Sequence, residues 1–141
     1  MEIEEIRQYS IEIREAVNDL LPQLSSSATL LDKTALKKVI ESEATHLLMA
    51  KENGEVCGML TLAVFRTPTG VRALIEDVVV RTDARGKGVG SALVKAVLEL
   101  AKSHHATTVD LTSRPGREAA NRLYQKIGFQ NRETNVYRID L

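Results

Sequence analysis

The spacing of apolar side chains in the first third of the chain predicts one short strand and two helices. Residues 2–8 alternate between charged and apolar positions, which favours a strand. In residues 9–24 and 33–43, apolar side chains recur every three or four positions, as they do in amphipathic helices. Asp32 directly precedes the second helical stretch and suits an N-cap. Both helices are therefore expected to bury one face.

The middle of the chain predicts three strands joined by tight turns. Residues 46–51 and 56–65 are apolar runs separated by Asn53-Gly54, a pair that strongly favours a hairpin between such runs. A further turn at residues 67–70 leads into a β-branched, apolar run at residues 71–80. We expect these three strands to be antiparallel neighbours.

The last part of the chain predicts a β-α-β unit followed by a helix and a strand. A helix after the third strand has one apolar face, and a short strand follows at residues 106–112. The next helix opens at Pro115-Gly116 and ends at Gly128, where a C-cap belongs. Residues 133–141 alternate and predict a last strand. The predicted fold class is α/β, with a mixed, mostly antiparallel sheet. The apolar face of the central helix consists of Val89, Leu93, Ala96, Val97 and Leu100.

Composition narrows the class of protein. The 141 residues are 43% hydrophobic and 27% charged, which is ordinary for one globular domain with its own core. The charged first residues do not fit a secretory signal, and no apolar run is long enough to span a bilayer, so we expect a cytoplasmic protein without a membrane partner. The single cysteine, Cys57, is expected to be a core thiol, and no metal site is expected. His46 has no evident companion along the chain.

Charge is distributed unevenly along the chain. The net charge is zero, which argues against a nucleic-acid partner. Residues 1–56 nevertheless carry 6 lysines and arginines against 11 aspartates and glutamates, a net charge of −5, and residues 57–141 carry the opposite net charge of +5. The basic part suits a polyanionic ligand. The acidic part either faces a cationic substrate or is only a solvated surface.

A glycine-rich loop between the third strand and the central helix is the main candidate for ligand binding. Glycines at alternate positions let a ligand approach the backbone, and the first N–H groups of the helix have no partner within it. The helix dipole adds partial positive charge, so this loop favours phosphate or pyrophosphate, although a plain turn is the alternative. The spacing matches neither a Walker loop nor the dinucleotide fingerprint. The residues concerned are Arg85, Gly86, Lys87, Gly88, Val89, Gly90 and Ser91.

The loop and a second motif resemble one family. The sequence R-G-K-G-V-G at residues 85–90 resembles the acetyl-coenzyme A signature of the GNAT superfamily of N-acetyltransferases, and L-Y-Q-K-I-G-F at residues 123–129 is similar to that family's L-Y-x-x-x-G-F motif. The resemblance implies a single domain over residues 1–141. Its parts would be an acceptor-side helical region (1–45), an acetyl-CoA-binding core (46–130) and a C-terminal strand (131–141).

In such proteins the central strand carries a bulge and diverges from the next strand, and the pantetheine arm of acetyl-CoA lies in the opening. The resemblance therefore implies an opening between residues 75–80 and 107–112. Backbone contacts to the cofactor are expected from Val78, Val79 and Val80.

The resemblance also implies the catalytic groups. Tyr124 matches the tyrosine that protonates the departing thiolate; otherwise it is a packing residue. Glu76 lies beside Asp77 within an apolar run, where an unpaired charge is costly, and strand alternation would send these two to opposite faces. Glu76 either takes the proton of the amine, directly or through a water, or pairs with Arg72 or Arg114.

The last predicted helix departs from the family at one cofactor position. The usual asparagine seven residues before the tyrosine is replaced by Arg117. Asn121 could substitute for that asparagine, or Arg117 could meet the phosphates of the cofactor.

These observations predict an acetyl-CoA-dependent N-acetyltransferase that acts by direct attack in a ternary complex. The expected acceptor is a small primary amine, such as a polyamine or amino sugar; a protein N-terminus or lysine is the alternative. The same loop would also fit a non-catalytic domain that senses coenzyme A, or a nucleotide-binding module. The last strand could pair across a homodimer.

Overall fold

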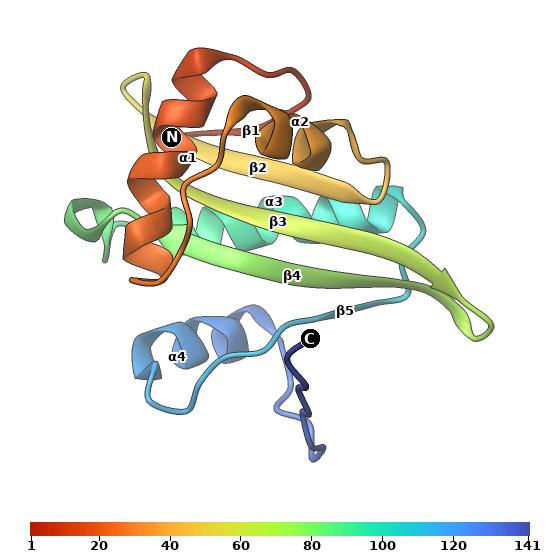
Figure 1. The fold of residues 1–141 in the computed structure, drawn as a ribbon. Coiled ribbons are helices and arrows are strands. Elements are labelled where there is room, and N and C mark those ends of the chain that lie inside the picture. The colour runs from red at the N-terminus through yellow and green to blue at the C-terminus, as the bar shows by residue number, and fades with distance from the viewer. The chain divides into compact units, whose positions relative to one another are not determined.

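Five strands form one mixed sheet in the computed structural model, which describes residues 1–141 (Figure 1). They lie in the order β1-β2-β3-β4-β5, with antiparallel pairing up to β4 and parallel pairing between β4 and β5. The predicted α/β class, with a mostly antiparallel sheet and a β-α-β unit, is confirmed. The strands are β1 (Glu2–Ile6), β2 (Thr45–Glu52), β3 (Glu55–Thr67), β4 (Gly70–Val80) and β5 (Thr108–Asp110).

The helices begin and end close to the predicted positions. Ser10 caps the first helix by accepting a hydrogen bond from the Ile13 N–H (3.1 Å), and Asp32 caps the second through the Ala35 N–H (2.8 Å). No helix combines the length and the apolar character that crossing a membrane requires. The helical elements are α1 (Ile11–Leu24), α2 (Lys33–Glu41), the 3₁₀ turn η1 (Thr82–Ala84), α3 (Val89–Ser103) and α4 (Glu118–Ile127).

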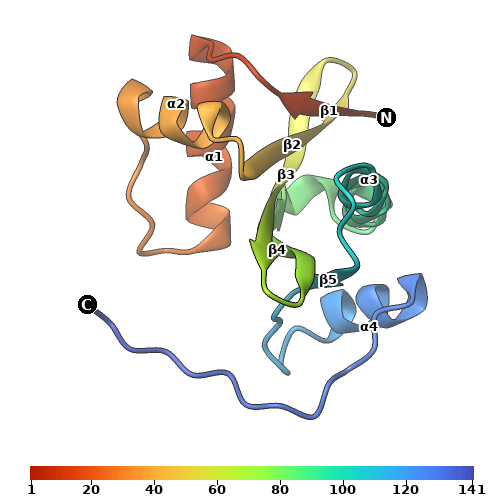
Figure 2. The same cartoon turned by 90° about the vertical axis from the view of Figure 1, so that its right-hand side faces the viewer.

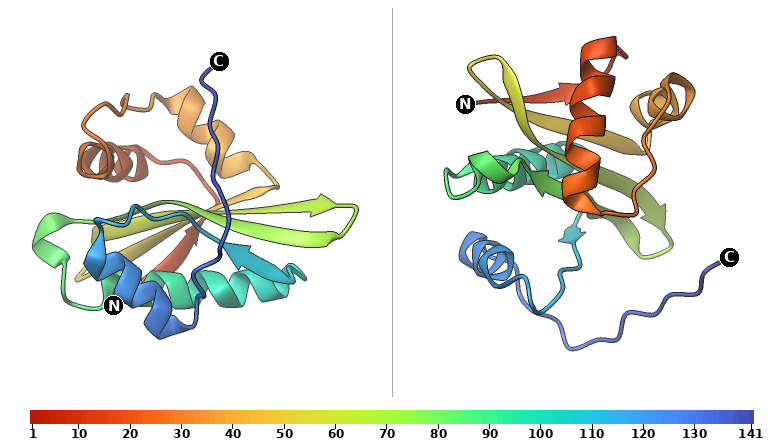
Figure 3. Two further views of the ribbon diagram at one scale, coloured as in Figure 1. Left: turned by 90° about the horizontal axis from the view of Figure 1, so that it is seen from below. Right: turned by 60° about the vertical axis from the view of Figure 1, so that its left-hand side comes forward.

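Helices cover the two faces of the sheet unequally. In Figures 2 and 3, α1 and α2 lie on one face and α3 lies on the other. Alternation along each strand supplies a separate apolar layer to each side. The layer under α1 and α2 joins Ile6, Val17, Leu20, Leu36, Ile40, Leu47, Met49, Met59 and Val79. By strand register, the layer facing α3 contains Leu48, Ala50, Leu60, Leu62, Ala73 and Ile75.

The buried face of α3 is rotated from the predicted one. Val89, Leu93 and Val97 are buried as predicted. Ala96 and Leu100 are only half-buried, whereas Val94 and Ala101 are buried in their place. An apolar helix offers several overlapping stripes at 3.6 residues per turn, and the sheet selects among them.

The chain divides into two compact units, Met1–Leu111 and Thr112–Leu141. The first holds the sheet with α1, α2 and α3, and the second holds α4 and the C-terminal segment. The predicted strand at 106–112 is shortened to β5. That the whole chain acts as one domain stays a prediction.

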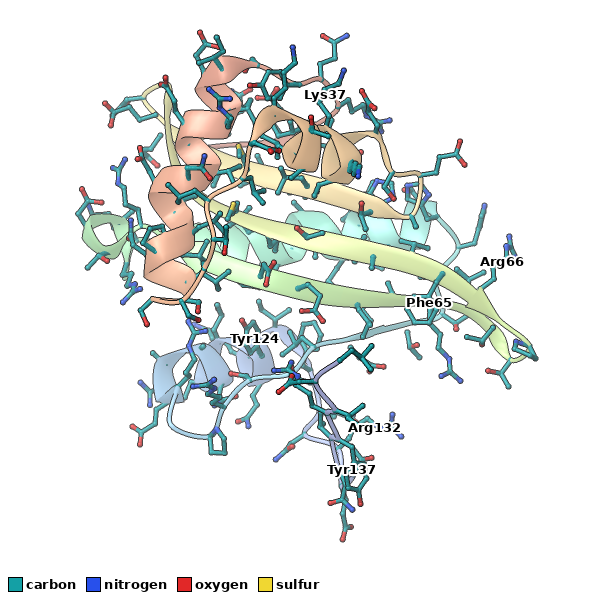
Figure 4. All side chains as sticks on the ribbon, in the orientation of Figure 1. Lys37, Phe65, Arg66, Tyr124, Arg132 and Tyr137 are labelled. Carbon is teal, nitrogen blue, oxygen red and sulfur yellow. The ribbon has the colours of Figure 1, made fainter.

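The predicted last strand at residues 133–141 is wrong. Residues 129–141 form neither helix nor strand. A strand needs backbone partners, and the second unit contains no strand that could supply them, so alternation alone does not create one. Tyr137, labelled in Figure 4, belongs to this exposed stretch, in which Val136, Ile139 and Leu141 are exposed as well. Pairing across a homodimer therefore remains a prediction.

Candidate functional site

The glycine-rich loop lies where β4 ends and α3 begins. After Val80 the chain passes through η1 and then turns at Gly86 (φ 78°) and Gly88 (φ 84°), the second of which is the N-cap of α3. Left-handed backbone of this kind favours glycine. A Cβ on either residue would meet no atom within 4 Å, so the glycines serve conformation and leave the outer side of the loop open.

The loop presents a row of backbone N–H groups without partners. None of the N–H groups from Gly86 to Ser91 donates a hydrogen bond within the protein, and the first bonded amide is Ala92, which donates to the Gly88 carbonyl (3.0 Å). The buried side chain of Val89 anchors this end of the helix to the core. Several free amides at a fixed helix N-terminus form a suitable site for a phosphate or pyrophosphate.

Two cations of this region remain available for a ligand. Arg81 is already engaged, since it forms ion pairs with Asp83 and Glu55 and donates to the Val56 carbonyl (3.3 Å). The same Arg81 guanidinium lowers the pKa of the Asp83 carboxyl. Arg85 donates only to the Val80 carbonyl (3.4 Å), and Lys87 forms no ion pair. Neither cation is held in an ion pair, although Lys87 also contributes to lowering the pKa of the Asp83 carboxyl.

The expected bulge lies in β4 at Asp77. Met59 pairs with Val79 and Thr61 pairs with Glu76, so two residues of β4 stand opposite a single residue of β3. Asp77 adopts φ 53° to accommodate the extra residue. The bulge breaks the simple alternation expected for Glu76 and Asp77, and both side chains are exposed. By its register with Thr61, Glu76 lies on the sheet face that carries α1 and α2.

The outer edge of β4 is unpaired along half of its length. Pairing with β5 involves only Arg72, Ala73 and Leu74, so the edge from Ile75 to Val80 has no strand partner. The expected divergence of residues 75–80 from residues 107–112 agrees with this short pairing but stays a prediction, because the chain from Thr112 onward belongs to the second unit. The backbone of Val78, Val79 and Val80 leads directly from this free edge toward η1 and the loop.

Glu76 has no ionic or hydrogen-bonding side-chain partner within the first unit. It forms no ion pair or side-chain hydrogen bond there, and Arg72 donates instead to Thr69 Oγ1 (2.7 Å). An ion pair of Glu76 with Arg72 is therefore wrong, whereas an ion pair with Arg114, which belongs to the second unit, stays a prediction. Because Arg72 does not engage it, the Glu76 carboxylate is available to act on a substrate.

The remaining candidates lie in the second unit. Tyr124 is the buried side chain of α4, and burial raises the pKa of its phenol, whereas the nearby Arg117 lowers it. Asn121 donates its amide to the Arg114 carbonyl (2.9 Å) and so holds the turn before α4. Arg117 is exposed at the N-cap position. The cofactor contacts expected of Arg117, Asn121 and Tyr124 stay predictions.

The predictions for Cys57 and His46 have different outcomes. Cys57 is buried, its thiol lies 3.5 Å from the Ala50 carbonyl, and burial raises its pKa, which confirms a core thiol. The expectation that His46 lacks a companion is wrong, because its Nδ1 lies 3.1 Å from Glu5 Oε2 and its ring lies 4.5 Å from that of His104. These partners come from distant parts of the chain, so sequence spacing gives no sign of them.

The comparisons with known proteins agree with this geometry. A sequence model of the acetyltransferase (GNAT) family matches residues 11–129. L-2,4-diaminobutyric acid acetyltransferase of Marinococcus halophilus is 32% identical over 116 residues, covering 81% of this chain and 66% of that protein. L-methionine sulfoximine/L-methionine sulfone acetyltransferase of Pseudomonas paraeruginosa is 32% identical over 85 residues, covering 60% of this chain and 49% of that protein. The chain therefore spans between about half and two thirds of the length of these relatives.

A solved structure resembles the chain along its whole length. It is described as a transcriptional regulator from Bacillus halodurans C-125, with a TM-score of 0.84 and 26% sequence identity. The similarity covers 99% of both chains.

Proposed function

Because the chain belongs to the acetyltransferase (GNAT) family, we propose that it moves an acetyl group from acetyl-CoA to the nitrogen of a primary amine. The observation that carries this proposal is the row of unpartnered amides from Gly86 to Ser91, which contains two left-handed glycines and leads into α3. Such a row suits the pyrophosphate of coenzyme A, and Arg85 and Lys87 supply the positive charge.

The free edge of β4 suits the pantetheine arm. A strand edge offers N–H and C=O groups to an extended ligand that carries amides of its own. The edge from Ile75 to Val80 is unpaired and runs toward the loop, so one extended molecule can meet both. In this proposal Val78, Val79 and Val80 bind the arm through their backbone, and Arg117 and Asn121 contribute from α4.

The proposed reaction is a direct transfer. Glu76, alone or through a water, takes a proton from the ammonium group of the acceptor, and the freed nitrogen attacks the thioester carbonyl carbon. A C–N bond forms, the C–S bond breaks, and the departing thiolate takes the phenolic proton of Tyr124. The attacking nitrogen then loses its second proton, which restores the phenol, and the product is a neutral amide. A phenol suits this task because it keeps its proton at neutral pH, and burial of Tyr124 strengthens that tendency.

The proposed acceptor is a small amine, such as a polyamine or amino sugar. Support comes from the names of the two relatives, both of which are acetyltransferases of small amino acids. The exposed Glu76 carboxylate on the α1 and α2 side of the sheet also suits a cationic acceptor.

Calorimetry with acetyl-CoA, NAD and ATP tests the cofactor. We expect acetyl-CoA to bind and the other two to bind at least about tenfold more weakly, since only acetyl-CoA carries the pantetheine arm. Gly88→Ala places a Cβ on left-handed backbone and should weaken acetyl-CoA binding, whereas the control Gly116→Ala should not. Equal binding of ATP would identify a nucleotide-binding module instead.

A thiol-release screen over amines and peptide N-termini tests the acceptor. Release with small amines supports the proposal, and release with peptides alone would point to a protein substrate. Binding of acetyl-CoA without turnover of any amine would indicate a sensor of coenzyme A.

A further inference from the structure

One side chain of α1 is bound to the turn that precedes the glycine-rich loop. Gln23 Oε1 accepts a hydrogen bond from the Thr82 N–H (2.8 Å) and another from Thr82 Oγ1 (3.0 Å). These two residues are 59 positions apart in the sequence. The contact therefore joins the last turn of α1 to the first residue of η1.

The orientation of the Gln23 amide is fixed by a third bond. Its Nε2 donates to the Asp19 carbonyl (3.1 Å), one turn earlier in α1. Only this orientation satisfies all three contacts, because a reversed amide would place its oxygen against the Asp19 carbonyl and its NH₂ group against the Thr82 N–H. The carbonyl of Gln23 is thus held toward Thr82.

The other side of the same turn is also held. The Arg81 N–H donates to the Cys57 carbonyl (2.7 Å), and the Arg81 side chain reaches Glu55 and the Val56 carbonyl at the start of β3. Gln23 supplies the matching restraint from α1. The orientation of η1 relative to the sheet is therefore fixed from both sides, and Arg85 directly follows η1 in the sequence.

We propose that Gln23 is a positioning residue that holds η1 so that the Gly86–Ser91 amides are arranged for coenzyme A before it binds. The inference rests on the proposed function, since it assigns the loop to that cofactor. A loop that is ordered in advance loses less conformational freedom when its ligand binds, and this raises affinity without any contact to the ligand. Gln23 also lies on a helix that covers the sheet face of Glu76, so one residue joins the acceptor side to the cofactor loop.

The test compares Gln23→Met with two other variants. Methionine has a similar length but accepts no comparable hydrogen bond, Thr82→Val removes the hydroxyl and keeps the N–H, and Gln8→Met is a matched control because Gln8 is exposed and unbonded. From two exposed hydrogen bonds we expect Gln23→Met to raise the Kd of coenzyme A and the KM of acetyl-CoA about three- to tenfold. The expected rise for Thr82→Val is about two- to threefold.

The pattern of kinetic constants separates positioning from general damage. The kcat and the KM of the amine of Gln23→Met should stay near the wild-type values. The double variant Gln23→Met/Thr82→Val should be no worse than Gln23→Met alone, because both changes remove the same contact. An unchanged Kd for coenzyme A in Gln23→Met, with the wild type binding normally, would overturn the inference.

Hydrogen exchange of the free protein gives a readout that needs no ligand. The hydrogen-bonded amides of Ala84, Arg85 and Ala92, which border the free row, should exchange faster in Gln23→Met than in wild type or Gln8→Met. If the wild type binds no coenzyme A, the proposed function fails, and the exchange result alone then decides whether Gln23 positions the loop. Unchanged exchange in that case would reject the positioning role too.

Discussion

The rings of Tyr124 and Phe129 meet edge to face, with centroids 5.9 Å apart and planes 69° to one another. The end of α4 explains this contact. Gly128 adopts φ 126°, and the Phe129 N–H turns back to the Tyr124 carbonyl (2.9 Å). A tyrosine, a glycine four residues later and a phenylalanine next to it therefore act together to terminate a helix and fix the tyrosine ring.

Gly128→Ala should loosen the end of α4. A Cβ at φ 126° costs about 1–3 kcal/mol, because an L-residue rarely adopts this conformation. We expect a lower thermal midpoint for Gly128→Ala, measured by circular dichroism. Gly116→Ala is the control, since it introduces the same methyl group where the backbone is not left-handed and space is open. Equal midpoints of the two variants would contradict the capping role.

Tyr124→Phe should abolish acid catalysis with little effect on binding. Loss of a positioned proton donor typically costs about a hundredfold or more in rate. We therefore expect kcat to fall by that factor, whereas the Kd of acetyl-CoA changes little. Steady-state kinetics and calorimetry on the same preparation measure both. Retained activity in Tyr124→Phe would exclude the phenol as the acid.

The raised pKa of Tyr124 also predicts an alkaline effect on stability. Burial favours the neutral phenol in the folded state, so both states are protonated below the ordinary tyrosine pKa of about 10 and the stabilisation is complete there. Above that pH the unfolded chain ionises first, and this stabilisation is lost as the pH rises through the folded pKa. The urea-unfolding free energy of wild type should therefore fall more steeply above about pH 10 than that of Tyr124→Phe. Parallel curves would contradict this.

Glu76→Gln should alter the pH dependence of turnover. Glutamine keeps the size of the side chain but cannot accept the ammonium proton. We expect kcat/KM to fall at neutral pH and to recover partly at high pH, where the free amine is already populated. The matched control is Asp77→Asn, the exposed neighbour within the bulge. A pH profile of Glu76→Gln that matches wild type on a good substrate would remove Glu76 from the mechanism.

Gly58→Ala should disturb the packing of α3 on β3. A Cβ at Gly58 would lie 3.0 Å from Val89 Cγ1, 3.1 Å from the Val79 carbonyl oxygen and 3.2 Å from Leu93 Cδ1. Such overpacking costs about 1–3 kcal/mol. We expect a lower unfolding free energy in urea, and weaker acetyl-CoA binding because Val89 starts the helix that carries the loop.

A second substitution tests whether overpacking causes the lower unfolding free energy of Gly58→Ala. Gly58→Ala/Val89→Ala should be destabilised by less than the sum of the two single variants, since the smaller side chain relieves the closest contact. Strict additivity would contradict the packing explanation.

Local signals in the sequence predicted most of the elements. Asp32 predicted the start of α2, Asn53-Gly54 predicted the β2–β3 hairpin, and Gly128 predicted the end of α4. Each of these depends on neighbouring residues, whose chemistry a sequence displays directly. The loop at residues 85–91 was found for the same reason, because its glycines and its two cations are contiguous.

Features that depend on distant partners could not be predicted in this way. The contact of Gln23 with Thr82 and the pairing of His46 with Glu5 join residues far apart in the sequence, and neither has a characteristic spacing. Residues 133–141 have the alternation of a strand, yet their own unit contains no strand to supply hydrogen bonds. The position of the bulge at Asp77 likewise follows from the register of β3 against β4, which the composition of β4 does not reveal.

The bulge also changes which face of the sheet the side chains of β4 point to. In a regular strand Ile75 and Val79 would point the same way, but the extra residue turns Ile75 toward α3 and Val79 toward α1 and α2. Mutations on the two sides of Asp77 should therefore change the unfolding free energy independently of one another, although the residues are close in sequence. Deleting Asp77 would force one half of the strand to expose its apolar residues and bury its polar ones, so natural variation in length at this position should be strongly disfavoured.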